Sequence, residues 1–334
     1  MAETARQVLS VRDLVVDFVQ DTGTTRALEG VNLDLHAGRV LGVVGESGCG
    51  KSLTARAVMR LVDRPGRIVS GQVLLDPGAP HQQDLTALDP ESEAMRRVRG
   101  GKVGLIFQEP MSALSMHYTV GNQIIEAIRA HGGLGKAAAR ARAVELLDEV
   151  GIPRPESRID AYPFQLSGGL RQRVGIALAL AADPEILIAD EPTTALDVTT
   201  QAQILALLRR LQRTKGMALM LITHDMGVIA QMADDVAVMY LGRVVEFAPV
   251  RRLFAAPRHP YTRALLRSVP SMRAVPRERL ATIGGAVPHP EQRPGGCAFH
   301  PRCPELIAGR CPVEPPPPLV PGHEGASCFH AAGS

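Results

Sequence analysis

Apolar and polar residues alternate through residues 8–20, and this period of two predicts an antiparallel strand with one buried face. A second such strand is expected around Val31–Leu35. Residues 40–44 are instead continuously apolar, which is typical of a strand buried on both faces. Further along, we expect a helix over residues 52–61, a polar helix over 91–99 and a short strand over 103–107.

The middle of the chain changes to a helical period. From residue 120 to about residue 180 the pattern is helical, with Val144, Leu147 and Val150 spaced by three. We expect a helical subdomain there, over about residues 109–180, inserted into an α/β core. Two buried strands, at 186–189 and 218–223, flank an amphipathic helix that carries Ile204, Leu205, Leu208 and Leu211. Strands that alternate with helices predict a parallel sheet covered on both faces.

The composition changes after an expected hairpin at residues 236–248. Proline and glycine become frequent there and culminate in four consecutive prolines at 315–318. We therefore place a boundary near Ala255 and expect a domain of residues 1–255 and an extension of residues 256–334.

The charge of the chain favours no particular partner. Its 334 residues carry a net charge of +3, and the basic residues are scattered among acidic ones. Tryptophan is absent and aromatic residues make up 3%, which argues against a stacking surface for single-stranded nucleic acid. Residues 1–12 do not resemble a secretory signal, and Asp183-Pro184 interrupts the longest apolar run, which is too short to span a bilayer. A membrane role would be peripheral, with the protein in the cytosol.

A phosphate-binding loop is predicted between the strand at 40–44 and the following helix. Its sequence is Gly45-Glu46-Ser47-Gly48-Cys49-Gly50-Lys51-Ser52. Glycines allow backbone N–H groups to surround phosphate oxygens, and the N-terminus of the helix adds a positive dipole end. Lys51 is expected to reach the outer phosphates and Ser52 to ligate Mg²⁺. Cys49 is expected to face the protein as a small side chain.

Two carboxylates, Asp190 and Glu191, follow the apolar strand at 186–189. The carboxyl ends of strands in an α/β sheet are where ligands bind. We expect Asp190 to support Mg²⁺ and Glu191 to polarise the attacking water. The alternative is that both acids cap the next helix, and spacing alone leaves it open.

Several further segments resemble the motifs of ABC ATPases, in the order of that family over about 210 residues. Leu166-Ser167-Gly168-Gly169-Leu170 resembles the LSGGQ signature, with leucine in place of the usual glutamine. Gln108 resembles the Q-loop glutamine, Thr194-Ala195-Leu196-Asp197 the D-loop, with threonine where serine is commoner, and His224 the switch histidine. Phe18 stands where the family places an aromatic residue against adenine.

The resemblance implies an ABC nucleotide-binding domain that hydrolyses ATP with Mg²⁺. It also implies a head-to-tail dimer in which each ATP lies between one subunit's phosphate loop and its partner's signature helix. The implied catalytic residues are Glu191, His224 and Gln108, and the implied Mg²⁺ ligands are Ser52, Gln108 and Asp190. The implied nucleotide contacts are Phe18, Gly45, Glu46, Ser47, Gly48, Cys49, Gly50, Lys51, Ser52, Leu53, Gln108, Ser167, Gly168, Gly169, Asp190 and Asp197.

The extension resembles the C-terminal region of dipeptide and oligopeptide importer ATPases. The resemblance rests on the segments 258–266 and 295–304. It implies a subunit on the cytoplasmic face of the membrane, with a second identical or different ATPase, two permeases and, through them, a solute-binding protein. Alternatives are an importer ATPase for nickel or another small solute, a soluble ABC protein acting on nucleic acid or ribosomes, and a partner with an inactive site. The presence of Glu191 and His224 argues against the last.

Four of the five cysteines gather in the extension, as Cys297, Cys303, Cys311 and Cys328. In a cytosolic chain such a cluster favours metal binding over disulfides. Four thiolates suit either tetrahedral Zn²⁺ or a [4Fe–4S] cluster, and the spacing does not choose between them. The family resemblance favours iron–sulfur. His300 and His330 flank cysteines and are further candidate ligands.

Overall fold

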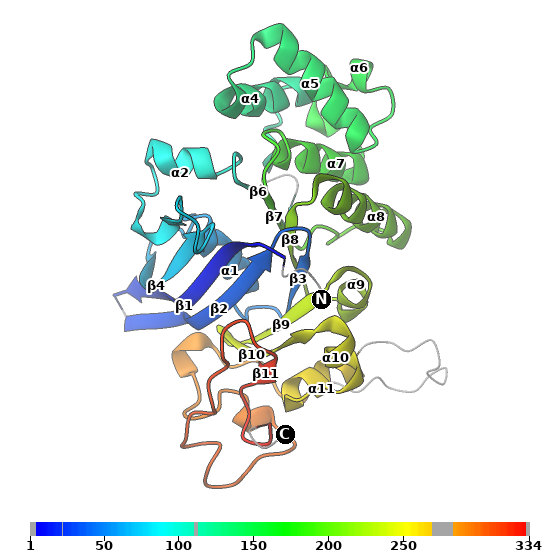
Figure 1. Ribbon diagram of the computed structural model, residues 1–334. Coiled ribbons are helices and arrows are strands. Elements are labelled where there is room, and N and C mark those ends of the chain that lie inside the picture. Colours follow the sequence, from blue (N-terminus) through cyan, green and yellow to red (C-terminus); the bar gives the residue numbers. More distant parts are fainter. Residues whose placement is uncertain (1–4, 22, 110–112, 269–282, 332–334) are drawn as a thin grey trace. The chain divides into compact units, whose positions relative to one another are not determined.

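The computed structural model describes residues 5–21, 23–109, 113–268 and 283–331 (Figure 1). The chain forms two compact units, each built from separate segments. The carboxylate unit, which contains Asp190 and Glu191, comprises Met1–Val8, His36–Arg39 and Leu88–Ile222. The phosphate-loop unit comprises Leu9–Leu35, Val40–Ala87 and Thr223–Ser334.

An antiparallel sheet begins the phosphate-loop unit, as the alternating pattern predicted. Its strand order is β2-β1-β4-β5, and β1 pairs antiparallel with β4. The register shifts between Arg12 and Val15, where Asp13 has a φ of 47°, so the alternation along β1 changes phase there. The strands are β1 (Gln7–Gln20), β2 (Gly23–His36), β4 (Gly66–Leu75) and β5 (Gln83–Asp84).

A second set of strands in this unit combines parallel and antiparallel pairs. The buried strand β3 (Val40–Val44) runs parallel to β9 (Asp235–Tyr240). The expected hairpin is confirmed, since β9 pairs antiparallel with β10 (Arg243–Pro249). Near the end of the chain, β11 (Gly325–Ala326) pairs with β10.

The helices of this unit are short. They are α1 (Lys51–Val58), α9 (Met226–Met232), α10 (Val250–Ala255) and α11 (Pro260–Arg267), with 3₁₀ turns η1 (Leu85–Ala87), η3 (Pro290–Gln292) and η4 (His300–Arg302).

One hydrophobic core continues from these strands into the extension. It contains Val44 of β3 and Tyr240 of β9 together with Tyr261, Leu265 and Phe299 from beyond residue 255. Helix α11 and Phe299 therefore pack on the same core as the nucleotide-binding strands. Burial of large aromatic side chains in a shared core ties the extension to the phosphate-loop unit.

The carboxylate unit contains three parallel strands. These are β6 (Val103–Ile106), β7 (Ile186–Asp190) and β8 (Ala218–Thr223), and β7 pairs with both of the others. Every residue of β7 and β8 is buried, which confirms the interpretation of their apolar runs. The amphipathic helix is α8 (Val198–Lys215), whose four predicted apolar positions are buried. The polar helix is α2 (Glu93–Val98).

The helical stretch is confirmed as α4 (Val120–Gly132), α5 (Lys136–Glu149), α6 (Pro155–Arg158), η2 (Pro163–Gln165) and α7 (Gly168–Ala179). In α5 the three-residue spacing was an incomplete guide, because Leu146 is fully buried beside Leu147 while Val144 is only half-buried. A turn of 3.6 residues brings positions both three and four apart onto one face, as with Ala143, Leu146, Leu147 and Val150, all of which are buried.

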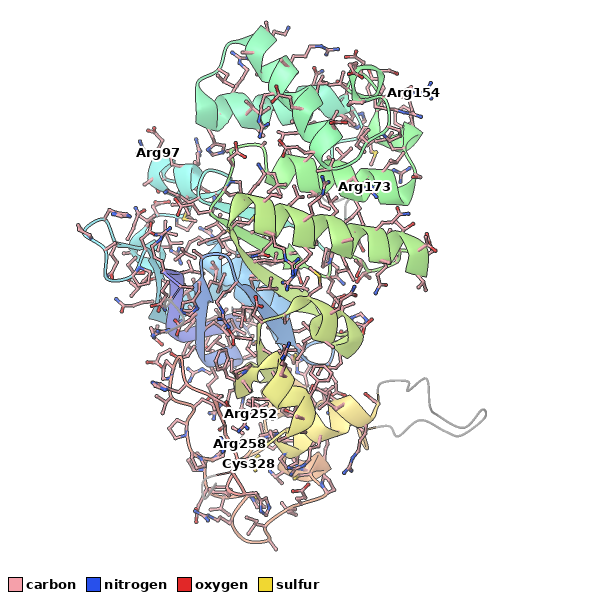
Figure 2. All side chains as sticks on the ribbon, turned by 45° about the vertical axis from the view of Figure 1, so that its right-hand side comes forward. Arg97, Arg154, Arg173, Arg252, Arg258 and Cys328 are labelled. Atoms are coloured by element: carbon pink, nitrogen blue, oxygen red, sulfur yellow. The ribbon has the colours of Figure 1, made fainter. Side chains whose placement is uncertain are left out.

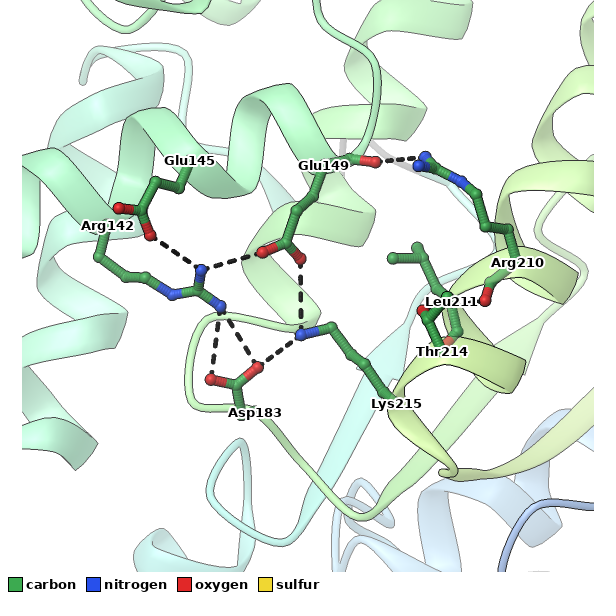
Figure 3. Close-up of polar contacts among 8 residues, drawn as sticks. All are labelled: Arg142, Glu145, Glu149, Asp183, Arg210, Leu211, Thr214 and Lys215. Carbon is green, nitrogen blue, oxygen red and sulfur yellow. Dashed lines mark hydrogen bonds and ion pairs between the residues drawn. The ribbon is translucent and has the colours of Figure 1, made fainter.

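An ion network joins α5 to the sheet side of the carboxylate unit (Figure 3). The Arg142 guanidinium contacts Glu149 at 2.9 Å and Asp183, before β7, at 3.4 Å. Lys215 at the end of α8 contacts the same two carboxylates at 3.5 and 2.7 Å. Two cations thus share two anions, which couples the helical stretch to α8 and to the loop that leads into β7.

Across the part of the chain that the structure describes, no helix has the length and apolar character needed to cross a membrane.

Candidate nucleotide site

The phosphate loop lies between β3 and α1, and its glycines adopt backbone conformations that other residues rarely do. Gly45, Gly48 and Gly50 have φ of 156°, 78° and 99°. At Gly45 a Cβ atom would lie 2.3 Å from the Met239 carbonyl oxygen of β9. The first glycine of the loop is therefore required both by its dihedral angle and by the close approach of the neighbouring strand.

Lys51 begins α1 and lies across the loop that precedes it. Its Nζ donates to the Gly45 carbonyl at 2.8 Å and to the Glu46 carbonyl at 3.0 Å, and the residue is 5% exposed. Ser47 and Gly48 are exposed, and Ser52 and Leu53 are half-buried in the first turn of the helix.

Cys49 is fully buried, and this burial raises its pKa to about 11. Its thiol faces the protein interior, as we expected.

Asp190 and Glu191 lie where β7 ends. Asp190 is the last residue of the strand and is buried, while Glu191 has a φ of 46°. The Glu191 carboxylate accepts hydrogen bonds from Gln108 Nε2 at 3.3 Å and from Thr194 Oγ1 at 2.8 Å. The structure thus brings the predicted Q-loop glutamine to the predicted catalytic carboxylate. The next helix, α8, has Asp197 as its N-cap, so neither acid of the pair occupies that position.

The signature segment forms the start of α7. Ser167 is the N-cap, and its side chain accepts a hydrogen bond from Leu170 N–H at 3.4 Å. Ser167 and Gly168 are exposed. At Gly169 a Cβ atom would lie 2.7 Å from Thr200 Cγ2 of α8, so a larger residue would disturb the packing of the two helices. The helix N-terminus with bare backbone that the sequence predicted is present.

The remaining site residues lie in defined positions of their own units. Asp197 accepts from Thr200 Oγ1 at 2.6 Å and from Thr200 N–H at 2.9 Å, and these hydrogen bonds lower the pKa of Asp197. His224 directly follows β8 and is exposed. Phe18 is half-buried in β1, opposite Gly66 of β4.

The predicted residues divide between the two units. Phe18, the phosphate loop and His224 belong to the phosphate-loop unit, and Gln108, the signature segment, Asp190, Glu191 and Asp197 belong to the carboxylate unit.

The four cysteines of the extension line one pocket and form no disulfide; Cys328 is labelled in Figure 2 at the same end of the unit as Arg258. Burial raises the pKa of Cys303 to about 11. Among the described residues, however, no group of three or more His, Cys, Asp or Glu side chains is arranged to hold a metal ion. The geometry therefore does not support the predicted metal-binding character of the extension, neither as [4Fe–4S] nor as Zn²⁺.

The two candidate histidine ligands have backbone partners instead. His300 Nδ1 lies 3.0 Å from the Cys297 carbonyl oxygen, and His330 Nε2 lies 2.9 Å from the Glu305 carbonyl oxygen.

Sequence reasoning missed two residues that contact the phosphate loop. Tyr261 and Arg302 of the extension both bind Glu46. The segments that contain them were singled out only for their resemblance to importer ATPases. No local pattern indicates a contact across more than 200 residues.

Comparison with known proteins agrees with this arrangement of motifs. A family model described as ABC transporter matches residues 28–194. The chain belongs to the ABC transporter family. Within that family, a model described as the C-terminal region of oligopeptide/dipeptide transporters matches residues 245–311.

Curated relatives in the ABC family align with nearly the whole chain. The dipeptide transport ATP-binding protein DppD of Escherichia coli (strain K12) is 48% identical over 309 residues, which cover 92% of each chain. A probable peptide ABC transporter ATP-binding protein of Sinorhizobium fredii is 47% identical over 327 residues, covering 97% of this chain and 95% of the relative. The chain is thus an ATP-binding subunit of the ABC family.

Solved structures confirm the cassette fold. A dimeric structure of the ABC transporter cassette MJ0796 matches with a TM-score of 0.63 and 28% identity, covering 73% of this chain and 99% of that one. CbiO1 of Clostridium perfringens, part of a CbiONQ transporter complex, matches with a TM-score of 0.62 and 28% identity, covering 75% and 92%.

Proposed function

We propose that this chain hydrolyses ATP to power the uptake of dipeptides or oligopeptides through a membrane ABC importer. The main support for the proposal is that both parts of the chain, the cassette and the extension, match transporter families. The cassette and the extension are each matched by a family model, and the dipeptide transport protein of E. coli aligns with 92% of the chain. A soluble ABC protein acting on nucleic acid would not be expected to share this extension.

The residues divide the chemistry between binding and hydrolysis. Lys51 binds the outer phosphates and Ser52 holds Mg²⁺, while the backbone N–H groups of the exposed loop around Gly48 donate hydrogen bonds to the phosphate oxygens. Phe18 stacks on the adenine. The loop geometry supports the roles of Lys51, Ser52 and Gly48, and the resemblance to the family supports that of Phe18.

Glu191 polarises the attacking water, and Asp190 supports Mg²⁺. Gln108 lies at 3.3 Å from the Glu191 carboxylate, which suits a residue that reports the state of the γ-phosphate to the helical stretch that follows it. His224 acts as the switch histidine of the site. Phosphoryl transfer depends mainly on such positioning and charge stabilisation.

The functional unit is a dimer of cassettes docked on permeases. Ser167, Gly168 and Gly169 form the start of α7, where Ser167 and Gly168 are exposed, and such a helix N-terminus suits the phosphates of an ATP held by a partner subunit. Asp197 caps α8, whose Thr200 lies against Gly169. The partner is a second ATPase of the same or a different sequence, and two permeases link the pair to a solute-binding protein. We therefore propose a location at the cytoplasmic face of the membrane, with residues 1–255 as the nucleotide-binding domain and residues 256–334 as the appended extension.

The test is Glu191→Gln in the purified chain. We expect ATP to remain bound while phosphate release falls by about two orders of magnitude or more. Undiminished hydrolysis in that variant would overturn the role of Glu191. Transport of labelled dipeptides by the reconstituted importer, compared with Ni²⁺ uptake, tests the peptide substrate against a nickel or small-solute importer.

We also propose that Cys297, Cys303, Cys311 and Cys328 bind one metal centre. The support is that all four are free thiols lining one pocket, and that ligation would stabilise an extension rich in proline. Bound metal would require these side chains to approach one another more closely. Anaerobic purification followed by metal and acid-labile sulfide analysis decides between the alternatives. Iron with sulfide indicates [4Fe–4S], and stoichiometric zinc indicates Zn²⁺. A protein purified with no iron and no zinc would refute the proposal.

A further inference from the structure

The extension holds one peptide group of the phosphate loop. The Tyr261 hydroxyl accepts a hydrogen bond from the Glu46 N–H at 2.8 Å. The carbonyl of the same peptide group belongs to Gly45, and it accepts from Lys51 Nζ at 2.8 Å. A peptide group is planar, so its N–H and C=O orientations are not independent. Fixing the Glu46 N–H therefore fixes the carbonyl that Lys51 contacts.

The side chain of Glu46 is held from the extension as well. Arg302 binds its carboxylate with two parallel contacts, Nη1 to Oε2 at 2.8 Å and Nη2 to Oε1 at 2.9 Å. The Arg302 side chain is 4% exposed and the Glu46 side chain 26% exposed, so solvent screens this partly buried pair less than it screens a surface pair. The two-pronged geometry is specific to arginine, because lysine presents only a point charge.

Arg302 is itself fixed in direction. Its Nε donates to the Gly284 carbonyl at 2.9 Å, and Nη2 reaches the Gly285 carbonyl at 3.4 Å. Its guanidinium also lies 5.9 Å from the ring centre of Tyr240 and 6.0 Å from that of Phe299. These contacts therefore orient the guanidinium independently of Glu46.

The same aromatic side chains fix Tyr261. The rings of Tyr240 and Tyr261 meet edge-on with centroids 4.8 Å apart, and Phe299 lies 5.3 Å from Tyr261. Tyr261 has no exposed surface. A hydroxyl on a ring packed in this way has little freedom to leave the Glu46 N–H.

We propose that Tyr261 and Arg302 are positioning residues of the nucleotide site, which act through Glu46 to hold the phosphate loop and Lys51 in the geometry that binds ATP. The inference deepens the proposed function and rests on it. It makes the extension part of the nucleotide site, even though neither residue reaches the phosphates. The extension would then set ATP affinity directly, in addition to any role in docking.

The test compares ATP binding in purified full-length variants. Tyr261→Phe removes one hydroxyl and keeps the ring, and Arg302→Gln removes the charge. We expect the Kd for ATP to rise about fivefold or more in Tyr261→Phe and about tenfold or more in Arg302→Gln. KM should rise with Kd, while kcat at saturating ATP stays closer to that of the wild type.

A matched control is Arg293→Gln. Arg293 also lies in the extension and pairs with Glu29 of β2 at 2.8 Å, with its side chain 19% exposed. It does not touch the phosphate loop in the described contacts, so Kd should change less than about twofold. An equal loss of affinity in this control would show a general effect of the extension and would overturn the proposal.

Glu46→Gln allows a second test, a double-mutant comparison of ATP affinity, which separates an effect through Glu46 from a general structural effect. If Arg302 acts through Glu46, the double variant Glu46→Gln/Arg302→Gln should bind ATP no worse than Arg302→Gln alone. Additive losses, or wild-type affinity in folded Tyr261→Phe and Arg302→Gln, would refute the inference. Failure of the wild-type chain to bind ATP would instead refute the proposed function.

Discussion

Replacement of His259 should remove part of the acid sensitivity of this protein. His259 is the N-cap of α11, and its Nδ1 accepts a hydrogen bond from Tyr261 N–H at 3.0 Å. It is 1% exposed, and burial, aided by the charge of Arg263, lowers its pKa from 6.5 to about 3. The backbone N–H of His259 meanwhile donates to the buried Glu246 carboxylate at 2.8 Å. Because of its low pKa, the ring stays neutral in the folded protein above about pH 3.

The sign of the effect follows from proton binding. The unfolded chain protonates His259 below about pH 6.5, whereas the folded chain does not do so until about pH 3. The unfolded state therefore binds more protons between these two pH values. The contribution of His259 to the free energy of unfolding is complete above pH 6.5 and decreases as the pH is lowered. The ceiling is about 5 kcal/mol, and the loss between pH 7.5 and pH 5 is about 2 kcal/mol.

The measurement is urea unfolding followed by circular dichroism at pH 7.5, 6 and 5. His259→Asn keeps an N-cap acceptor and removes the titrating ring. It should lower stability at pH 7.5 through lost packing but lose about 2 kcal/mol less than the wild type on acidification. The control is His289→Asn, because His289 caps η3 in a similar way with a side chain 64% exposed. The reasoning is wrong if His259→Asn and the wild type show the same dependence on pH.

Two further predictions concern the two units separately. Gly45→Ala should abolish ATP binding and destabilise the protein more than Gly48→Ala, because a Cβ at Gly45 meets the Met239 carbonyl at 2.3 Å while Gly48 has open space; the latter costs about 1 kcal/mol for its left-handed backbone. Equal urea midpoints for the two variants would contradict this. Arg142→Ala should cost about 1 kcal/mol, since it leaves the half-buried Glu149 and the exposed Asp183 with one cation fewer. Arg140, on the same helix, makes only an exposed ion pair with Asp160. Arg140→Ala should therefore change the urea midpoint much less, and a larger loss there would count against the network.

Much of the fold could be read from residue patterns. The apolar runs at 40–44 and 186–189 predicted buried strands, and both are buried along their whole length. Such runs are informative because a strand covered on two faces has no position where a polar residue is favoured. The pattern in α5 was less reliable, since Leu146 and Leu147 are both buried and a three-residue spacing describes only part of a helical face.

The nucleotide residues were found because their chemistry is local. A phosphate loop needs its glycines, lysine and serine at fixed spacing in one turn of chain, so Gly45 to Ser52 can be recognised without a structure. The cysteine pattern was less informative. The sequence predicted that the four cysteines cluster, and the fold does bring their thiols to one pocket, but ligand geometry depends on side-chain placement that no short motif encodes.

Contacts between distant segments were decided by the tertiary structure alone. Tyr261 and Arg302 meet Glu46 from 215 and 256 residues away, because β9 and β10 carry the extension back onto the core beside β3. A hydrogen bond between residues so far apart leaves no periodicity in the sequence. The sequence by itself therefore determined the motifs that bind and hydrolyse ATP, whose geometry is local, whereas packing on the shared core decided which residues of the extension hold the phosphate loop.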